Sequence, residues 1–335
     1  MKFPRKTTLL IVGGIVILGG IVYGAQHQSA GSGLLPSLFG STSGSTVDVA
    51  LTDAQPIGIS ARGTYVFAVD SAQTTLYSIT TKTGTVQEYA LPAAVVTAHT
   101  NPAESELLIT TTREENPLIL TTLATSSPQT LPDLLSADWV NDTQLIAFTK
   151  DARLVTYDIS NPGVIALPVQ MQPSELTNPQ IEHAGYASLV RSTTRDDDLP
   201  LYRYWLITNN TFHELFDRAV SATLTPDGTY VTGTTVESTV VKGIRTQDVQ
   251  SNTAPCTPIG THTDKYTCIT PQTASDGTEQ WVITEFSPGS AQSVHAITAP
   301  ISNTLGIFMI NDIVYAYSNG LLYHGNIMTL INNAS

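Results

Sequence analysis

The stretch WVNDTQLIAFTKDARLVTYDI, residues Trp139–Ile159, contains two apolar strands and the turns around them. Asn141-Asp142 is a turn signal, Leu145–Phe148 is a continuous apolar run, and a short polar loop separates it from a second strand pattern. A strand with apolar side chains on both faces has to be covered on both sides. A blade packed between two other blades of a ring has this pattern.

The same unit recurs seven times. The copies are ARGTYVFAVDSAQTTLYSI from Ala61, ESELLITTTREENPLILTTL from Glu104, NDTQLIAFTKDARLVTYDI from Asn141, AGYASLVRSTTRDDDLPLYRYWLI from Ala184, PDGTYVTGTTVESTVVKGI from Pro226, SDGTEQWVITEFSPGSAQSVHAI from Ser275 and NDIVYAYSNGLLYHGNI from Asn311. Their analogous turn positions are Gly63, Ser105, Asp142, Gly185, Gly228, Gly277 and Asp312, separated by 42, 37, 43, 43, 49 and 35 residues. Periods near 40 residues are typical of propeller blades.

From Val47 onward the chain shows almost no helical periodicity and is crowded with short runs of Val, Ile, Thr, Tyr and Phe between Gly, Pro, Asn and Asp. We therefore predict an all-β fold, a seven-bladed β-propeller over residues 47-335. A ring of blades has to be closed. Val47–Leu51 is one candidate for the outermost strand of the seventh blade, and Met328–Ile331 is the competing candidate.

Trp139–Ile159 and LTPDGTYVTGT, residues Leu224–Thr234, resemble TolB-type, WD-like propeller repeats. In that family an Asn-Asp or Pro-Asp-Gly element makes the turn between a blade's innermost strand and the next, which suits Asn141-Asp142, Pro226–Gly228 and Asn311-Asp312. The aspartate is missing at Glu104-Ser105 and at Ala184-Gly185, so these two blades depart from the family pattern. The resemblance implies the fold much more than the function.

The N-terminal segment has the features of a membrane anchor. Leu9–Val22 carries no charge, and with its neighbours the apolar segment 7-25 approaches the ~20 residues that span a bilayer. Lys2, Arg5 and Lys6 precede it, and no Lys or Arg follows until Arg62, which predicts a cytoplasmic N-terminus. We expect a cytoplasmic tail at 1-6, a single-pass signal anchor at 7-25 and an extracytoplasmic propeller. A secretory signal cleaved before Ala25 is the alternative.

Residues 26-46 are rich in Gly and Ser and predict a flexible linker. The whole chain has 15 Lys and Arg against 28 Asp and Glu, a net charge of -13. Without the three basic residues of the tail the charge is -16, so nucleic acid and anionic lipid surfaces are poor partners.

Cys256 and Cys268 are the only cysteines, 12 positions apart, and the unit around them has the longest spacing. In an exported domain this predicts a disulfide. A zinc site would need further ligands, and His262 is the only nearby imidazole.

No catalytic, metal or cofactor motif is present: the chain lacks G-x-S-x-G, H-E-x-x-H, G-x-G-x-x-G and G-x-x-x-x-G-K. Asp196–Asp198 lacks the spacing of a calcium loop. The seven histidines share no position in the unit except His295 and His324, which we assign to its third strand. We therefore predict no cofactor, although a propeller enzyme can assemble a channel site that leaves no linear motif.

Charge is concentrated in the loops that we expect between the second and third strands of three consecutive blades. In the other units these loops are nearly neutral, as in Asp70–Gln73, Ser287–Ser290 and Ser318–Gly320. The candidate binding residues are Arg113, Glu114 and Glu115, then Lys150, Asp151 and Arg153, then Arg195, Asp196, Asp197 and Asp198. They predict the polar rim of a protein- or glycan-binding site on a scaffolding module of the cell envelope. A subunit of an envelope assembly, or a hydrolase or lyase with a channel site, is the alternative.

Overall fold

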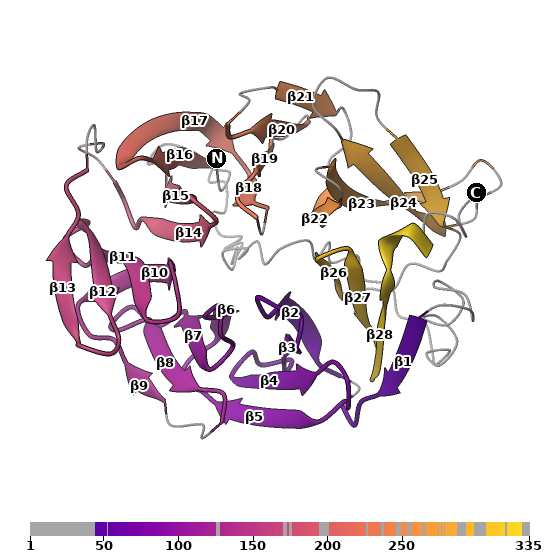
Figure 1. The fold of residues 1–335 in the computed structure, drawn as a ribbon, viewed down its shortest axis with the longest axis horizontal. Coiled ribbons are helices and arrows are strands. Elements are labelled where there is room, and N and C mark those ends of the chain that lie inside the picture. The colour runs from indigo at the N-terminus through magenta and orange to yellow at the C-terminus, as the bar shows by residue number, and fades with distance from the viewer. Residues whose placement is uncertain are drawn as a thin grey trace, which may run out of the picture.

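Seven four-stranded antiparallel sheets stand side by side around a central channel in the computed structural model (Figure 1). The structure describes residues 44–51, 53–124, 128–169, 173, 176–193, 201–225, 227–235, 238–245, 249–252, 256–262, 265–273, 275, 277, 279–286, 293–297, 306–318 and 320–329. The predicted anchor and most of the predicted linker lie outside these residues. Within them, no helix is both long and apolar enough to cross a membrane.

The first four blades follow one another along the chain, each running from its innermost to its outermost strand. Blade 1 contains β2 (Gln55–Ile59), β3 (Tyr65–Val69), β4 (Thr75–Thr80) and β5 (Val86–Ala90). Blade 2 contains β6 (Val95–Thr100), β7 (Glu106–Thr111), β8 (Leu118–Thr122) and β9 (Gln129–Thr130). Blade 3 contains β10 (Leu134–Trp139), β11 (Gln144–Thr149), β12 (Leu154–Asp158) and β13 (Gly163–Ala166). Blade 4 contains β14 (Gln180–Ala184), β15 (Ala187–Thr193), β16 (Tyr202–Thr208) and β17 (Thr211–Ala219).

The last three blades complete the ring. Blade 5 contains β18 (Ser221–Leu224), β19 (Tyr230–Thr234), β20 (Thr239–Gly243) and β21 (Val249–Asn252). Blade 6 contains β22 (Thr257–His262), β23 (Lys265–Thr273), β24 (Glu279–Phe286) and β25 (Ser293–Ile297). Blade 7 contains β26 (Gly306–Ile310), β27 (Ile313–Ser318), β28 (Leu321–Asn326) and, as its outermost strand, β1 (Gly44–Asp48). The predicted count of seven blades is confirmed.

The N-terminal strand closes the ring. β1 pairs with β28 from Gly44 opposite Gly325 to Asp48 opposite Leu321, so the last blade is built from both ends of the propeller (Figure 1). Of the two candidates for this role, the segment around Val47 is the one used, and the strand starts at Gly44, inside the predicted linker. In the competing segment, Met328–Ile331, the described residues 328 and 329 belong to a helical turn, residues 327–329.

The turn signals lie where the family resemblance implies, between a blade's innermost strand and the next. Gly228 has a φ of 67° and Asn311 and Asp312 have φ of 49° and 64°, a backbone region that favours Gly, Asn and Asp. In blade 5 the Thr225 hydroxyl accepts a hydrogen bond from the Tyr230 amide at 3.0 Å, which fixes the turn. The two blades that lack the aspartate also form complete sheets.

The sixth unit was misassigned by one strand. Ser275–Gly277 lies between β23 and β24, so QWVITEF is the third strand of blade 6 and not the second. The second strand is the preceding apolar run in β23, and His295 belongs to the fourth strand, β25. An Asp-Gly turn can join the first and second strands of a blade or the second and third. The prediction followed the Asp-Gly turn and overlooked the apolar run in β23 as a strand of its own.

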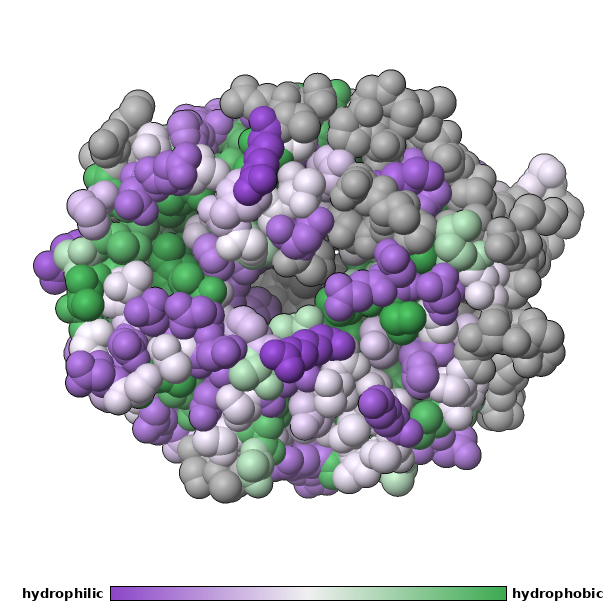
Figure 2. Space-filling model, viewed as in Figure 1, coloured by the Kyte–Doolittle hydropathy of each residue, from purple (hydrophilic) through white to green (hydrophobic). Residues whose placement is uncertain are grey.

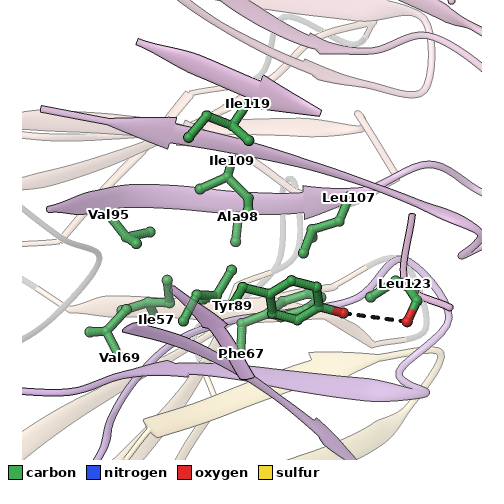
Figure 3. Packing of buried hydrophobic residues seen from close by; sticks show 11 residues of the cluster. Ile57, Phe67, Val69, Tyr89, Val95, Ala98, Leu107, Ile109, Ile119 and Leu123 are labelled. Carbon is green, nitrogen blue, oxygen red and sulfur yellow. Dashed lines mark hydrogen bonds between the residues drawn. The ribbon is translucent and has the colours of Figure 1, made fainter. Parts of the chain in front are cut away.

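Apolar side chains fill the spaces between neighbouring blades. Between blades 1 and 2, Phe67, Leu76 and Leu107 are fully buried (Figure 3). The Tyr89 ring joins this cluster, and its hydroxyl donates a 3.4 Å hydrogen bond to the Leu123 carbonyl of the next blade (Figure 3). Each such buried side chain contributes roughly 1.5–3 kcal/mol, so the packing between blades holds the ring rigid.

Candidate functional site: charged loops and a polar channel arc

Two of the three charged loops are described, and the structure brings them together. The β7–β8 loop (112–117) and the β11–β12 loop (150–153) each join the second strand of a blade to the third, so they lie on the same face of the ring. Lys150 Nζ donates a 3.1 Å hydrogen bond to Asn116 Oδ1, which links the two loops across the gap between blades 2 and 3. The predicted residues of both loops are exposed.

The β11–β12 loop is a tight, ordered turn. The Ala152 amide donates to the Thr149 carbonyl at 2.9 Å, and Ala152 has a φ of 58°. Arg153 Nε lies 2.6 Å from Asp151 Oδ2, with 71% and 59% of these side chains exposed. The hydrogen bond from Thr149 lowers the pKa of Asp151, and the Arg153 charge lowers it further. The turn therefore holds a cation and an anion at a defined position on the surface.

The other loops of the predicted pattern are only partly described. Arg195, Asp196, Asp197 and Asp198 lie outside the described residues, so the extension of the charged surface to blade 4 stays a prediction. Ser287–Ser290 also lies outside the described residues, and β24, which precedes it, is the third strand of its blade and not the second. The short Asp70–Gln73 turn is held by its own aspartate, since Asp70 Oδ1 accepts from the Thr74 amide at 2.8 Å.

A second polar cluster lies on the innermost strands, which surround the hollow at the centre of the ring (Figures 1 and 2). It contains His99, Asp138, Glu182 and Thr223, one residue from the innermost strand of each of blades 2 to 5. Opposite them in the second strands are Leu108, Ile146, Leu189 and Thr232, so the four occupy equivalent positions. We call this set the channel arc.

His99, Asp138 and Glu182 each contact the next blade. His99 Nδ1 lies 3.0 Å from Asp138 Oδ1, and Asp138 Oδ2 accepts from the His183 amide at 2.7 Å. Glu182 Oε1 accepts from the Thr223 hydroxyl at 2.8 Å and from the Leu224 amide at 3.1 Å. The inner edge of an innermost strand has no further strand to pair with, and these carboxylates satisfy amides there.

The electrostatics of the arc favour bound protons. Burial in the channel lowers the pKa of His99, but the charge and hydrogen bond of Asp138 outweigh it and raise this pKa to about 9. The His99 side chain is still 41% exposed. Burial raises the pKa of Glu182 to about 7, with the Asp138 charge adding to it and the Thr223 hydrogen bond opposing it.

Sequence reasoning missed the channel arc. Its residues are about 40 positions apart, and the repeats were aligned on the turn and the strands that follow it, which leaves the innermost strands out. A signal does exist in the sequence, because each of these polar residues stands three to six positions before the turn position of its unit. Within the described residues no group of His, Cys, Asp and Glu is arranged to hold a metal ion.

Cys256 and Cys268 are joined by a disulfide, with their Cα atoms 5.7 Å apart. They connect the entry to β22 with β23 and pack with Tyr230, Val241 and Tyr266 in a cluster between blades 5 and 6. The disulfide is therefore part of a contact between blades. The spacing of 49 residues between Gly228 and Gly277 does not mark a long insertion at the cysteines, because Gly277 is in the turn after β23 and not in the turn before it.

No protein-family model and no curated protein sequence matches the chain. Solved structures similar to it include one of the mitotic checkpoint complex, with a TM-score of 0.57 at 11% identity, covering 92% of this chain and 99% of that chain. Another is the structure of the RRP9 WD40 repeats, with a TM-score of 0.57 at 8% identity, covering 85% and 98%. A third is virginiamycin B lyase from Staphylococcus aureus, with a TM-score of 0.52 at 14% identity, covering 84% and 98%.

These similarities define the chain as a WD-like, seven-bladed β-propeller. At such low identities they show the fold alone. None of the three structures is described as TolB-type, so that part of the resemblance stays a prediction.

Proposed function

We propose that this propeller is a protein- or glycan-binding scaffold held at a membrane by its N-terminal segment, with the ring outside the cytoplasm. The binding face is the one that carries the β7–β8 and β11–β12 loops. The observation that carries this proposal is the contact between Lys150 and Asn116, which joins two exposed, charged loops into one continuous surface. Propellers commonly serve as rigid scaffolds for protein partners, and one of the similar structures is that of a complex.

The chemistry of this surface suits recognition. Arg113, Lys150 and Arg153 present cations beside Glu114, Glu115 and Asp151, a mixture that sets orientation and association rate more than affinity. Arginine is also enriched among the residues that dominate binding energy. The partner we expect is therefore a folded protein with charges of both signs, or an acidic glycan that binds the three cations.

Photo-cross-linking tests the proposal. A photoreactive residue at Glu115 should capture a defined envelope component, and the same probe at Lys82 should not, because Lys82 follows β4 and lies on the opposite face. The triple variant Arg113→Ala, Lys150→Ala, Arg153→Ala should reduce the Glu115 yield at least tenfold. Equal capture from both faces, or an undiminished yield in a folded triple variant, contradicts the proposal.

Anchoring has a separate test. After alkaline extraction the full chain should stay with the membrane fraction, and a chain that starts at Gly44 should be released. The appearance of a shortened chain starting at Ala25 would favour the cleaved signal.

The channel also raises the alternative of a hydrolase or lyase, because a carboxyl with a pKa of about 7 beside an imidazole can transfer protons. However, both Asp138 oxygens and one Glu182 oxygen are occupied by partners on their own or neighbouring strands. This arrangement favours a structural role for the arc over a catalytic one.

A further inference from the structure

The channel arc joins the blades that carry the charged loops. His99 is on β6 of blade 2, Asp138 on β10 of blade 3 and Glu182 on β14 of blade 4. His99 contacts Asp138, Asp138 accepts from the amide of His183 in blade 4, and Glu182 accepts from the amide of Leu224 in blade 5. Any change in these hydrogen bonds alters how the four blades are held to one another.

We propose that the channel arc is a proton-linked brace, which holds blades 2 to 5 together while it keeps its protons and loosens the binding face when it loses them. The effect on the binding face rests on the function proposed above. The brace itself rests on the hydrogen bonds between neighbouring innermost strands, and its dependence on protons rests on the buried charges of His99, Asp138 and Glu182 that lie between these strands.

The titratable groups that meet in the brace are few. His99 faces Asp138 from β10 and Glu182 from β14, while β2, on the other side of β6, has no titratable residue. Glu182 faces Asp138 and His99 on one side, and on the other β18 brings Thr223 and no titratable residue. The His183 ring bonds Ser188 of β15 at 2.8 Å, and burial lowers its pKa. Arg191 of β15 bonds Gln180 instead.

The direction of the pH effect follows from these groups. The pKa of Glu182 is raised from 4.5 to about 7, so the stability gained by keeping its proton is complete below 4.5 and lost as pH rises through 7. The pKa of His99 is raised from 6.5 to about 9, so its contribution is complete below 6.5 and lost as pH rises through 9. Once His99 and Glu182 have lost their protons, Asp138 and Glu182 are two nearby anions whose charge His99 no longer balances. The brace is therefore tight at acidic pH and loose at alkaline pH.

Hydrogen exchange read by mass spectrometry tests the brace in the whole chain. After correction for the intrinsic pH dependence of exchange, protection of segments 134–139, 180–184 and 221–224 should fall at least tenfold between pH 6 and pH 9.5. Segments 55–59 and 306–310 provide the internal control, because these innermost strands contain no titratable residue and should keep their protection.

Glu182→Gln keeps an oxygen acceptor for Leu224 and removes the titration. We expect this variant to lose the part of the pH effect that falls between pH 6 and pH 8. The matched control is Glu214→Gln, in the same blade on the exposed outer strand β17, which should behave as the wild type. Identical pH dependence in Glu182→Gln and the wild type, or an equal fall in segments 55–59 and 306–310, would overturn the brace.

The cross-linking yield from Glu115, measured at pH 6 and pH 9, tests the link to the binding face. We expect at least a threefold lower yield at pH 9 in the wild type and a smaller difference in Glu182→Gln. If protection changes while a specific yield does not, the link is overturned and the brace stands. If no specific cross-link forms at either pH, the proposed function fails, and the exchange result still decides the brace.

Discussion

At the scale of single residues, two glycines show the difference between a turn that is packed against the neighbouring blade and one that is open. Gly228 and Gly277 both have a left-handed backbone, with φ of 67° and 84°. A Cβ on Gly228 would lie 2.2 Å from the Ala184 carbonyl oxygen of the neighbouring blade, whereas a Cβ on Gly277 would meet nothing within 4 Å. Only the first glycine is required by contact between blades as well as by conformation.

We expect Gly228→Ala to lower the free energy of unfolding by about 3 kcal/mol, because backbone strain and the clash with blade 4 add. Gly277→Ala is the matched control and should cost only the strain, about 1 kcal/mol. Urea unfolding of the two variants measures the difference. Equal losses would show that the turns of blades 4 and 5 do not touch.

The His99 imidazole gives a direct reading of the brace. Its pKa of about 9 depends on Asp138, because burial alone lowers it. In Asp138→Asn we expect this pKa to fall by about one to three units. Titration of the His99 ring by NMR measures the change, and the ring of His324, on β28 in blade 7, serves as the control that should not move. An unchanged His99 pKa would show that Asp138 does not raise it.

At the scale of elements, the disulfide stabilises the contact between blades 5 and 6. The Cys256 amide donates to the Thr239 hydroxyl of blade 5 at 3.2 Å, and both cysteines are buried in a cluster shared by the two blades. The double variant Cys256→Ala, Cys268→Ala should lose about 3 kcal/mol, the value typical of a short closed loop. Urea unfolding with and without reductant provides the measurement. A reductant effect that persists in the double variant would assign the loss to another cause.

The role of β1 in closing the ring leads to a separate prediction. A chain that starts at Gly44 should keep the thermal midpoint of the propeller, and a chain that starts at Val49 should lose several degrees, since each kcal/mol moves the midpoint of a domain this size by about 2 °C. Calorimetry of the two truncations measures it. A midpoint unaffected by the loss of β1 would mean that β28 needs no partner.

Element by element, the predictable part of the fold follows from the central strands. β3, β7 and β11 lie between two strands and two blades, so they carry continuous apolar runs that can be recognised. Outer strands such as β13, whose four residues are all exposed, have no such run. The innermost strands mix small, polar and apolar residues, because one edge faces the channel. The channel arc lies in these strands and was therefore hidden.

At the scale of the whole molecule, the ring brings together residues that no local pattern connects. The charged loops were predictable, because each is a contiguous run of charge in a chain in which 13% of residues are charged. The contact between Lys150 and Asn116 was not predictable, because it depends on how blades 2 and 3 are placed relative to each other. The same placement turns four separate polar residues into one arc.

The closure by β1 also decides how the ring responds to mechanical tension. The chain enters the propeller at Gly44, opposite Gly325 near the end of β28, so a pull on the N-terminal side acts first on this single pair of strands. A pull along the strands loads the five residue pairs at once in shear, whereas a sideways pull peels them one at a time. In an optical trap with handles ahead of Gly44 and at the C-terminus, we expect a small, reversible first extension from the release of β1. The larger rips of whole blades should follow at higher force.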